Sequence, residues 1–80
     1  MSDVVEAGRA KVAEADTKAE QAEFNVNQAK VELRAAQGAA GADVEQAEFN
    51  VKQAEVELRA ARDQLKEARE ELAKAEGANQ

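Results

Sequence analysis

Among the side chains of this 80-residue sequence, glutamates at helical spacing are the best candidates for a reactive site. Glu20 lies three residues before Glu23, which puts both on one face of a helix. The same spacing recurs in the cluster of Glu67, Glu70 and Glu71. Clustered carboxylates can bind a metal ion or act as an acid and a base, but helical di-iron sites also need Glu-x-x-His motifs, and this chain has no His. We interpret the carboxylates as a solvated surface and expect no catalytic, cofactor-binding or metal site.

Missing residue types exclude most other chemistry. The chain has no Cys, His, Trp, Tyr or Pro, so disulfides, thiol nucleophiles, Ser-His triads and Cys/His zinc sites cannot form. The net charge is −6, with both signs mixed along the chain, which argues against nucleic-acid binding because that needs a basic stripe. No run of about 18 apolar residues is present, so we expect no membrane insertion. We predict a protein that is not an enzyme and needs no cofactor.

The composition and an internal repeat point to long helices. Ala, Glu, Lys, Leu and Arg form more than half of the chain, which is typical of coiled coils. Residues 20–36 read EQAEFNVNQAKVELRAA, and residues 45–61 read EQAEFNVKQAEVELRAA, with 15 of 17 positions identical. Two copies are too few for a solenoid, so we interpret the repeat as a duplication inside a helical element.

The segment between the copies predicts a hairpin turn. Gly38 suits the left-handed residue that follows a helix end, and Gly41 lies in the same short loop. Asp43 suits the N-cap of a second helix, because its carboxylate can accept from the first backbone amides. Gln46, three residues later, would complete a capping box.

The chain ends repeat this pattern. Asp3 with Glu6 resembles a capping box, and Gly77 suits the residue that follows a helix. We therefore expect one domain, residues 1–80, that consists of a helix over 4–37, a loop over 38–43 and a helix over 44–76. A single continuous helix is the alternative, but it would carry the cost of internal glycines and leave the caps unused.

Small and medium apolar residues alternate at three- and four-residue spacing along both expected helices, which is the heptad pattern of a coiled coil. The first helix carries Val5, Gly8, Val12, Ala15, Ala19, Ala22, Val26, Ala29, Leu33 and Ala36. The second carries Val44, Ala47, Val51, Ala54, Leu58, Ala61, Leu65, Ala68, Leu72 and Ala75. We call these twenty positions the seam.

If the chain folds back at the loop, each seam residue of the first helix meets the seam residue of the second helix whose number brings the sum to 80. Nine of the ten layers then place a larger side chain against Ala or Gly, as in Val5 with Ala75, Gly8 with Leu72 and Ala15 with Leu65. A parallel pairing would put Ala on Ala in half of its layers and leave little to bury. The fold class that we predict is therefore all-α: a two-helix antiparallel coiled-coil hairpin with an Ala-rich seam.

Polar residues beside the seam are consistent with this register. The pairs that could meet are Arg9 with Glu76, Asp16 with Arg69, Glu23 with Arg62, Lys30 with Glu55, and Lys11 with Glu71. Exposed pairs contribute only about 0–1 kcal/mol each, so they indicate register rather than stability. Asn25 and Asn50, equivalent in the two repeats, could hydrogen-bond across the seam.

Four larger apolar residues do not fit the seam. At about 100° per residue, Phe24 and Val31 lie on the side of the first helix opposite the seam. Phe49 and Val56 do the same on the second helix. One interpretation is that the duplication copied two stray surface residues, because single exposed apolar residues are normal. The other is that these residues are contacts for self-association.

Self-association could take two forms. If hairpins stand side by side in the same orientation, Phe24 of one faces Val56 of the next, and Val31 faces Phe49, which gives a ring or a row. A two-fold pairing that buries one face in a four-helix bundle is equally simple. Because a lone two-helix hairpin of this size is marginal, we expect a homo-oligomer or a place in a larger protein assembly.

The spacing of residue types in QAEVELRAARDQLKEARE and QAKVELRAAQG resembles that of the α-helical hairpin of periplasmic adaptor proteins. These proteins are the membrane fusion subunits of tripartite efflux pumps and hemolysin-type secretion systems. The resemblance covers nearly the whole chain and implies a periplasmic location, a ring of hairpins and contact between their tips and an outer-membrane channel. Residues 37–43 lack the Arg, Leu and Ser pattern associated with that contact. An engineered or consensus hairpin would share these features.

The function that we predict is that of a structural coiled-coil module which mediates lateral self-association or protein–protein assembly. The alternative is a hydrophilic, conditionally disordered linker or protective segment that becomes helical on binding or drying. The sequence leaves the oligomer number, the compartment and a natural or engineered origin open.

Overall fold

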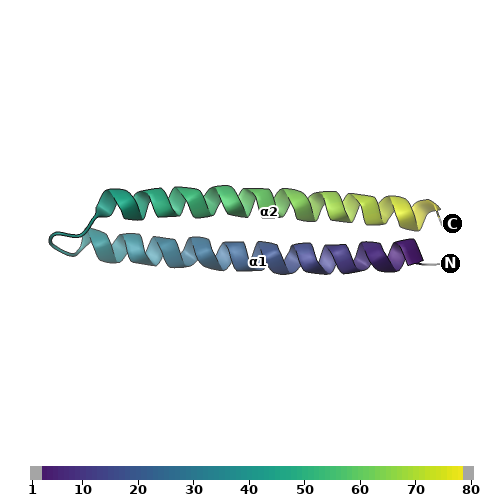
Figure 1. The fold of residues 1–80 in the computed structure, drawn as a ribbon, viewed down its shortest axis with the longest axis horizontal. Coiled ribbons are helices and arrows are strands. Elements are labelled where there is room, and N and C mark those ends of the chain that lie inside the picture. Colours follow the sequence, from purple (N-terminus) through teal and green to yellow (C-terminus); the bar gives the residue numbers. More distant parts are fainter. Residues whose placement is uncertain (1–2, 79–80) are drawn as a thin grey trace.

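Two antiparallel helices form a rod. The computed structural model describes residues 3–78, which form α1 (Asp3–Gln37), a loop over 38–43 and α2 (Val44–Ala78). The helices lie side by side along their length, with the loop at one end of the rod and both chain ends at the other (Figure 1). The Cα trace extends 62 Å along the rod and 13 and 11 Å across it. The described residues contain no strand, so the all-α hairpin is confirmed.

The helix ends near the chain termini differ from the expected pattern. Asp3 is the first residue of α1, not a cap that precedes it, and its charge lies in the first turn with that of Glu6, where negative charge is favourable. Gly77 lies inside α2, which continues to Ala78, so the prediction that Gly77 closes the helix is wrong. A glycine ends a helix only when its backbone turns left-handed, and Gly77 does not have a positive φ.

The loop turns at Gly41 and not at Gly38, so the left-handed residue lies three positions later than expected. The Gly38 amide still donates to the carbonyls of Arg34 and Ala35, at 3.3 and 3.2 Å, as a residue that continues the helix does. Gly41 has a φ of 79°, a conformation that strains any residue with a Cβ. The chain therefore reverses one short turn beyond the end of α1.

Asp43 caps α2 as its residue type predicts. Its Oδ1 accepts a hydrogen bond of 3.0 Å from the Gln46 amide, which satisfies one of the backbone donors left over at the start of a helix. The capping box is incomplete, because the Gln46 side chain donates forward to Asn50 Oδ1 at 3.0 Å and does not reach back. The cap therefore depends on the Asp43 carboxylate.

The seam is the whole interior of the rod. All twenty seam positions are buried or half-buried, and every other residue from 3 to 78 is exposed. Such a narrow stripe is what a strict heptad pattern dictates, since only two of seven residues can face a single partner helix. Methyl-sized Ala side chains let the two backbones approach closely while Val and Leu fill the remaining space.

Contacts within the seam fix the register. A Cβ built on Gly8 would lie 3.1 Å from Leu72 Cδ1 and 3.6 Å from the Leu72 Cα, so Gly8 faces Leu72 directly. A cluster of buried residues spans the next three layers of the pairing that adds up to 80: Ala15, Ala19, Leu65 and Ala68, with Val12 and Ala61 packed against them. The larger-against-smaller arrangement is therefore present where Val12 meets Ala68 and where Leu65 meets Ala15, whereas the next layer, Ala19 with Ala61, holds two small residues.

Two of the five expected ion pairs are made. Arg9 Nη2 lies 3.6 Å from Glu76 Oε2, and Arg62 Nη2 lies 3.4 Å from Glu23 Oε2. The pairs expected for Asp16, Lys30 and Lys11 do not form within residues 3–78. Because long side chains on an exposed surface gain little from one fixed geometry, the two pairs that form mark the register and add little stability.

Candidate self-association surface

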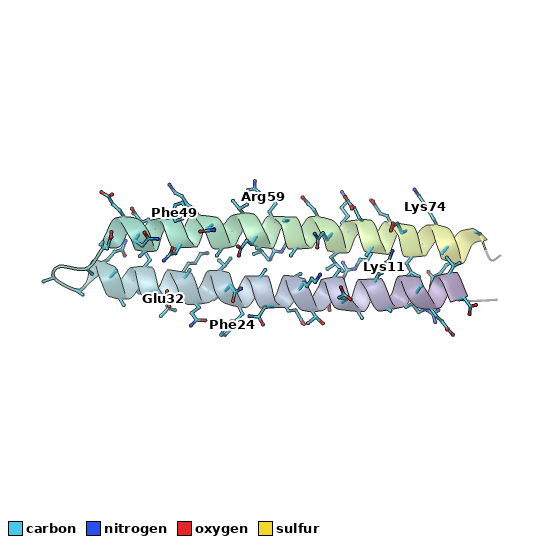
Figure 2. All side chains as sticks on the ribbon, viewed as in Figure 1. Lys11, Phe24, Glu32, Phe49, Arg59 and Lys74 are labelled. Atoms are coloured by element: carbon cyan, nitrogen blue, oxygen red, sulfur yellow. The ribbon has the colours of Figure 1, made fainter. Side chains whose placement is uncertain are left out.

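The four apolar residues outside the seam are the most conspicuous surface feature. Phe24, Val31, Phe49 and Val56 are between 58% and 64% exposed. Phe24 projects from α1 on the side away from α2 (Figure 2). We call Phe24 with Val31 the α1 patch and Phe49 with Val56 the α2 patch.

Helix geometry explains why each patch is continuous. Phe24 and Val31 are seven residues apart, which is nearly two full turns, so they line up about 10 Å apart along one face. Phe49 and Val56 have the same spacing. Both pairs occupy the heptad position directly opposite the seam, so the two patches lie on opposite sides of the hairpin and a single partner cannot cover both.

The two patches also stand at the same height on the rod. In the observed register, residues whose numbers add up to 80 are level with each other. Phe24 is therefore level with Val56, and Val31 with Phe49. Each aromatic ring on one side of the hairpin corresponds to a valine on the other side.

Each patch has one charged flank and one uncharged flank. The charged flank of the α1 patch contains Glu20, Asn27 and Arg34, and that of the α2 patch contains Glu45, Lys52 and Arg59. The uncharged flanks contain Gln21, Gln28 and Ala35 on α1 and Gln46, Gln53 and Ala60 on α2. All twelve side chains are exposed. The apolar surface thus continues on one side of each patch onto amides and methyl groups, which bury at lower cost than charges.

Hydrogen bonds of the repeated Asn residues stay within each helix. Gln21 Nε2 donates to Asn25 Oδ1 at 3.1 Å, and Gln46 Nε2 donates to Asn50 Oδ1 at 3.0 Å. The expectation that Asn25 and Asn50 could bond across the seam is therefore wrong. Residues four positions apart on one helix are neighbours, which places each Gln amide within reach of the Asn oxygen.

Val4 is an exposed apolar residue that the sequence pattern did not single out. It is 68% exposed and precedes the first seam residue, Val5. Its position at the end of α1 gave no periodic signal, since no equivalent residue recurs seven positions later. Val4 lies on neither patch, which makes it a useful control.

The remaining surface offers little for chemistry. No group of three or more metal-ligating side chains gathers within residues 3–78. The surface hollows are open grooves beside the seam that are lined by both signs of charge; one of them contains Glu23, Lys30, Glu55 and Arg62. Neither described helix is long and apolar enough to cross a lipid bilayer. The apolar patches are therefore the surface that most needs an explanation.

No family model matches this chain. Searches of curated proteins and of solved structures also find no match. The resemblance to periplasmic adaptor hairpins therefore rests on the residue pattern alone.

Proposed function

We propose that this protein is a non-enzymatic structural module that assembles with copies of itself through the α1 and α2 patches. The observation that carries the proposal is the pair of patches. They consist of four large apolar side chains, each more than half exposed, on opposite sides of a rod whose seam is already filled. Repeated apolar stripes outside an occupied seam are typical of helices that contact a second partner.

Stability gives a second reason. The nine buried side chains are Val, Ala and one Leu, and none is aromatic, so the hairpin buries little apolar surface by itself. Both aromatic residues of the chain remain outside. Burying them between hairpins would add the apolar contact that the seam lacks.

The adaptor resemblance is compatible with this proposal, because hairpins that stand side by side in an assembly would use their outer faces. The proposal itself does not depend on an efflux or secretion system. It requires only that outer faces of separate hairpins meet.

We expect the helix content of the protein to fall on dilution, because an assembly that binds only the folded hairpin stabilises it by mass action. Circular dichroism at 222 nm over a dilution series of about a thousandfold measures this, with the fraction of helix plotted against concentration. A disordered spectrum that is the same at every concentration would support the alternative of a disordered segment and contradict the proposal.

A further inference from the structure

The structure indicates which face of a second copy each patch binds, an inference that rests on the proposed self-association. We propose that the α1 patch of one hairpin binds the α2 patch of a neighbour that has the same orientation and the same height. The contact is heterologous, so the hairpins form a ring or an open row with all loops at one end.

The apolar residues meet in this arrangement. The α1 of one hairpin runs antiparallel to the α2 of its neighbour, and residues whose numbers add up to about 80 are level, as they are inside the hairpin. Phe24 then faces Val56 of the next copy, and Val31 faces Phe49. Each layer contains one ring and one branched aliphatic side chain, so the large apolar area of each ring is covered.

The charged flanks are complementary in the same arrangement. Between antiparallel helices, equivalent heptad positions lie on the same side of the contact, as Glu23 and Arg62 do within the hairpin. Glu20 is then level with Arg59 of the neighbour, and Arg34 with Glu45. None of these four side chains forms an ion pair inside the hairpin over residues 3–78. Figure 2 shows Arg59 pointing away from α1, toward the side where the neighbour would stand.

The uncharged flanks meet each other as well. Gln28 is level with Gln53 of the neighbour, and Gln21 with Ala60. Side-chain amides that face each other can exchange hydrogen bonds. The contact therefore has opposite charges on one side of the apolar residues and amides on the other, with no like charges along the repeated segments.

A two-fold pairing gives the repeated segments equally favourable contacts. The repeat is complementary to a second copy of itself that runs antiparallel to it. If α1 met α1 of a second copy, Phe24 would face Val31 and Glu20 would face Arg34. The flanks alone therefore do not choose between the two arrangements, and the deciding residues have to lie outside the repeats.

Alanines near the start of α1 favour the same-orientation contact. Ala7, Ala10 and Ala13 form an exposed stripe of small residues on the outer face of α1. In the proposed arrangement they are level with the long side chains of α2 at positions 74, 70 and 66, which are Lys74, Glu70 and Lys66. Small residues then face long ones, whose aliphatic stems can lie over the methyl groups while the charges reach water.

The two-fold pairing does not use these alanines. With Phe24 opposite Val31, the two α1 helices overlap only from about residue 18 to the loop, and the alanine stripe remains uncovered. The same-orientation contact overlaps along both helices completely. Glu14 is level with Glu67 in that contact, but Lys66 is adjacent, so the local charge is balanced.

Charge exchange tests the orientation. One variant carries Glu20→Lys with Arg34→Glu on α1, and a second carries Glu45→Lys with Arg59→Glu on α2. In the proposed contact each variant alone places like charges together, and we expect association about tenfold weaker at low salt. One chain with all four changes restores opposite charges at every contact and the mass of the wild-type assembly. An equimolar mixture of the two variants restores association in assemblies where the variants alternate. Circular dichroism at high concentration verifies that each variant is helical.

The outcomes separate the two proposals. A wild-type protein that stays monomeric contradicts self-association itself. If the wild type assembles and both charge variants keep the same mass as the wild type, the proposed orientation is overturned. In a two-fold contact the two substituted residues of each variant face each other, so their charges stay opposite. Weakened single variants that neither the mixture nor the fourfold variant restores would also overturn it.

Disulfide cross-linking provides a second readout. The chain has no Cys, so Gln28→Cys and Gln53→Cys each introduce a single thiol. In the proposed contact, mixing the two variants under oxidation gives a cross-linked heterodimer, and Gln28→Cys alone gives none. Cross-linking of Gln28→Cys with itself, and not with Gln53→Cys, would demonstrate the two-fold pairing and contradict the proposal.

Discussion

Replacement of Phe24 and Phe49 by Ser is expected to reduce the assembly to the single hairpin at concentrations where the wild type is assembled. Both rings are more than half exposed in the hairpin, so removing them does not disturb the seam. Each contact between hairpins would lose two rings, which we expect to cost about 3 kcal/mol, or roughly a 100-fold weaker association. Sedimentation equilibrium at matched concentrations measures this change.

A matched control distinguishes loss of the contact from a general effect of surface polarity. Val4 is as exposed as the patch residues but lies outside both patches, so Val4→Ser should leave the mass unchanged. Because the contact is weakened and not abolished, the helix content of the Phe24→Ser, Phe49→Ser variant should recover at concentrations roughly 100-fold higher than those at which the wild type is helical. A wild-type mass in that variant would mean that the rings are not the contact.

Removing the large residue of one seam layer should lower the stability strongly, and adding a large residue at the facing position should recover part of that loss. Leu65 is buried opposite Ala15. Leu65→Ala removes the main apolar side chain of the layer and should destabilise the folded protein by about 2–5 kcal/mol. Ala15→Leu adds a side chain where Leu65 already fills the space, at a cost of about 1–3 kcal/mol. The double variant restores one large and one small residue.

Urea denaturation of the four proteins forms a double-mutant cycle. We expect the double variant to be more stable than the Leu65→Ala variant, with a coupling energy of about 1–3 kcal/mol between the two sites. As a control, Ala15→Leu combined with Leu58→Ala should show no such recovery, because residue 58 belongs to a different layer. If the Ala15 and Leu65 effects simply add, these residues are not paired and the register is wrong.

The seam could be predicted from the sequence because one physical rule determines it. A stripe of apolar residues at three- and four-residue spacing can face only one partner helix, and the difference in size between Val or Leu and Ala selects the antiparallel pairing. Gly8 illustrates this: its position opposite Leu72 follows from arithmetic, and the 3.1 Å that would separate a Cβ at Gly8 from Leu72 Cδ1 agrees with it.

The local details were harder to predict because several arrangements have similar energy. Gly38 and Gly41 both permit a left-handed turn, and only the geometry of the loop assigns it to Gly41. Gln46 could reach back to the backbone or forward to Asn50, and it does the latter. For exposed ion pairs the energies are too small for the sequence to decide which ones form.

The patches illustrate what a single chain can and cannot reveal. Their positions opposite the seam follow from helix periodicity alone, and their exposure agrees with that. What covers them depends on a second copy, and the sequence left the same-orientation and two-fold arrangements open. The alanine stripe of Ala7, Ala10 and Ala13, level with long side chains of α2, provides the reason to prefer the same-orientation contact.

The most direct test of self-association is the molar mass of the wild-type protein, measured by light scattering over a range of concentrations. A single chain has a mass of 8.6 kDa. We predict a mass well above this value that rises with concentration, together with the helix content. A helical protein that keeps a mass of 8.6 kDa at every concentration would contradict the proposal that these hairpins assemble.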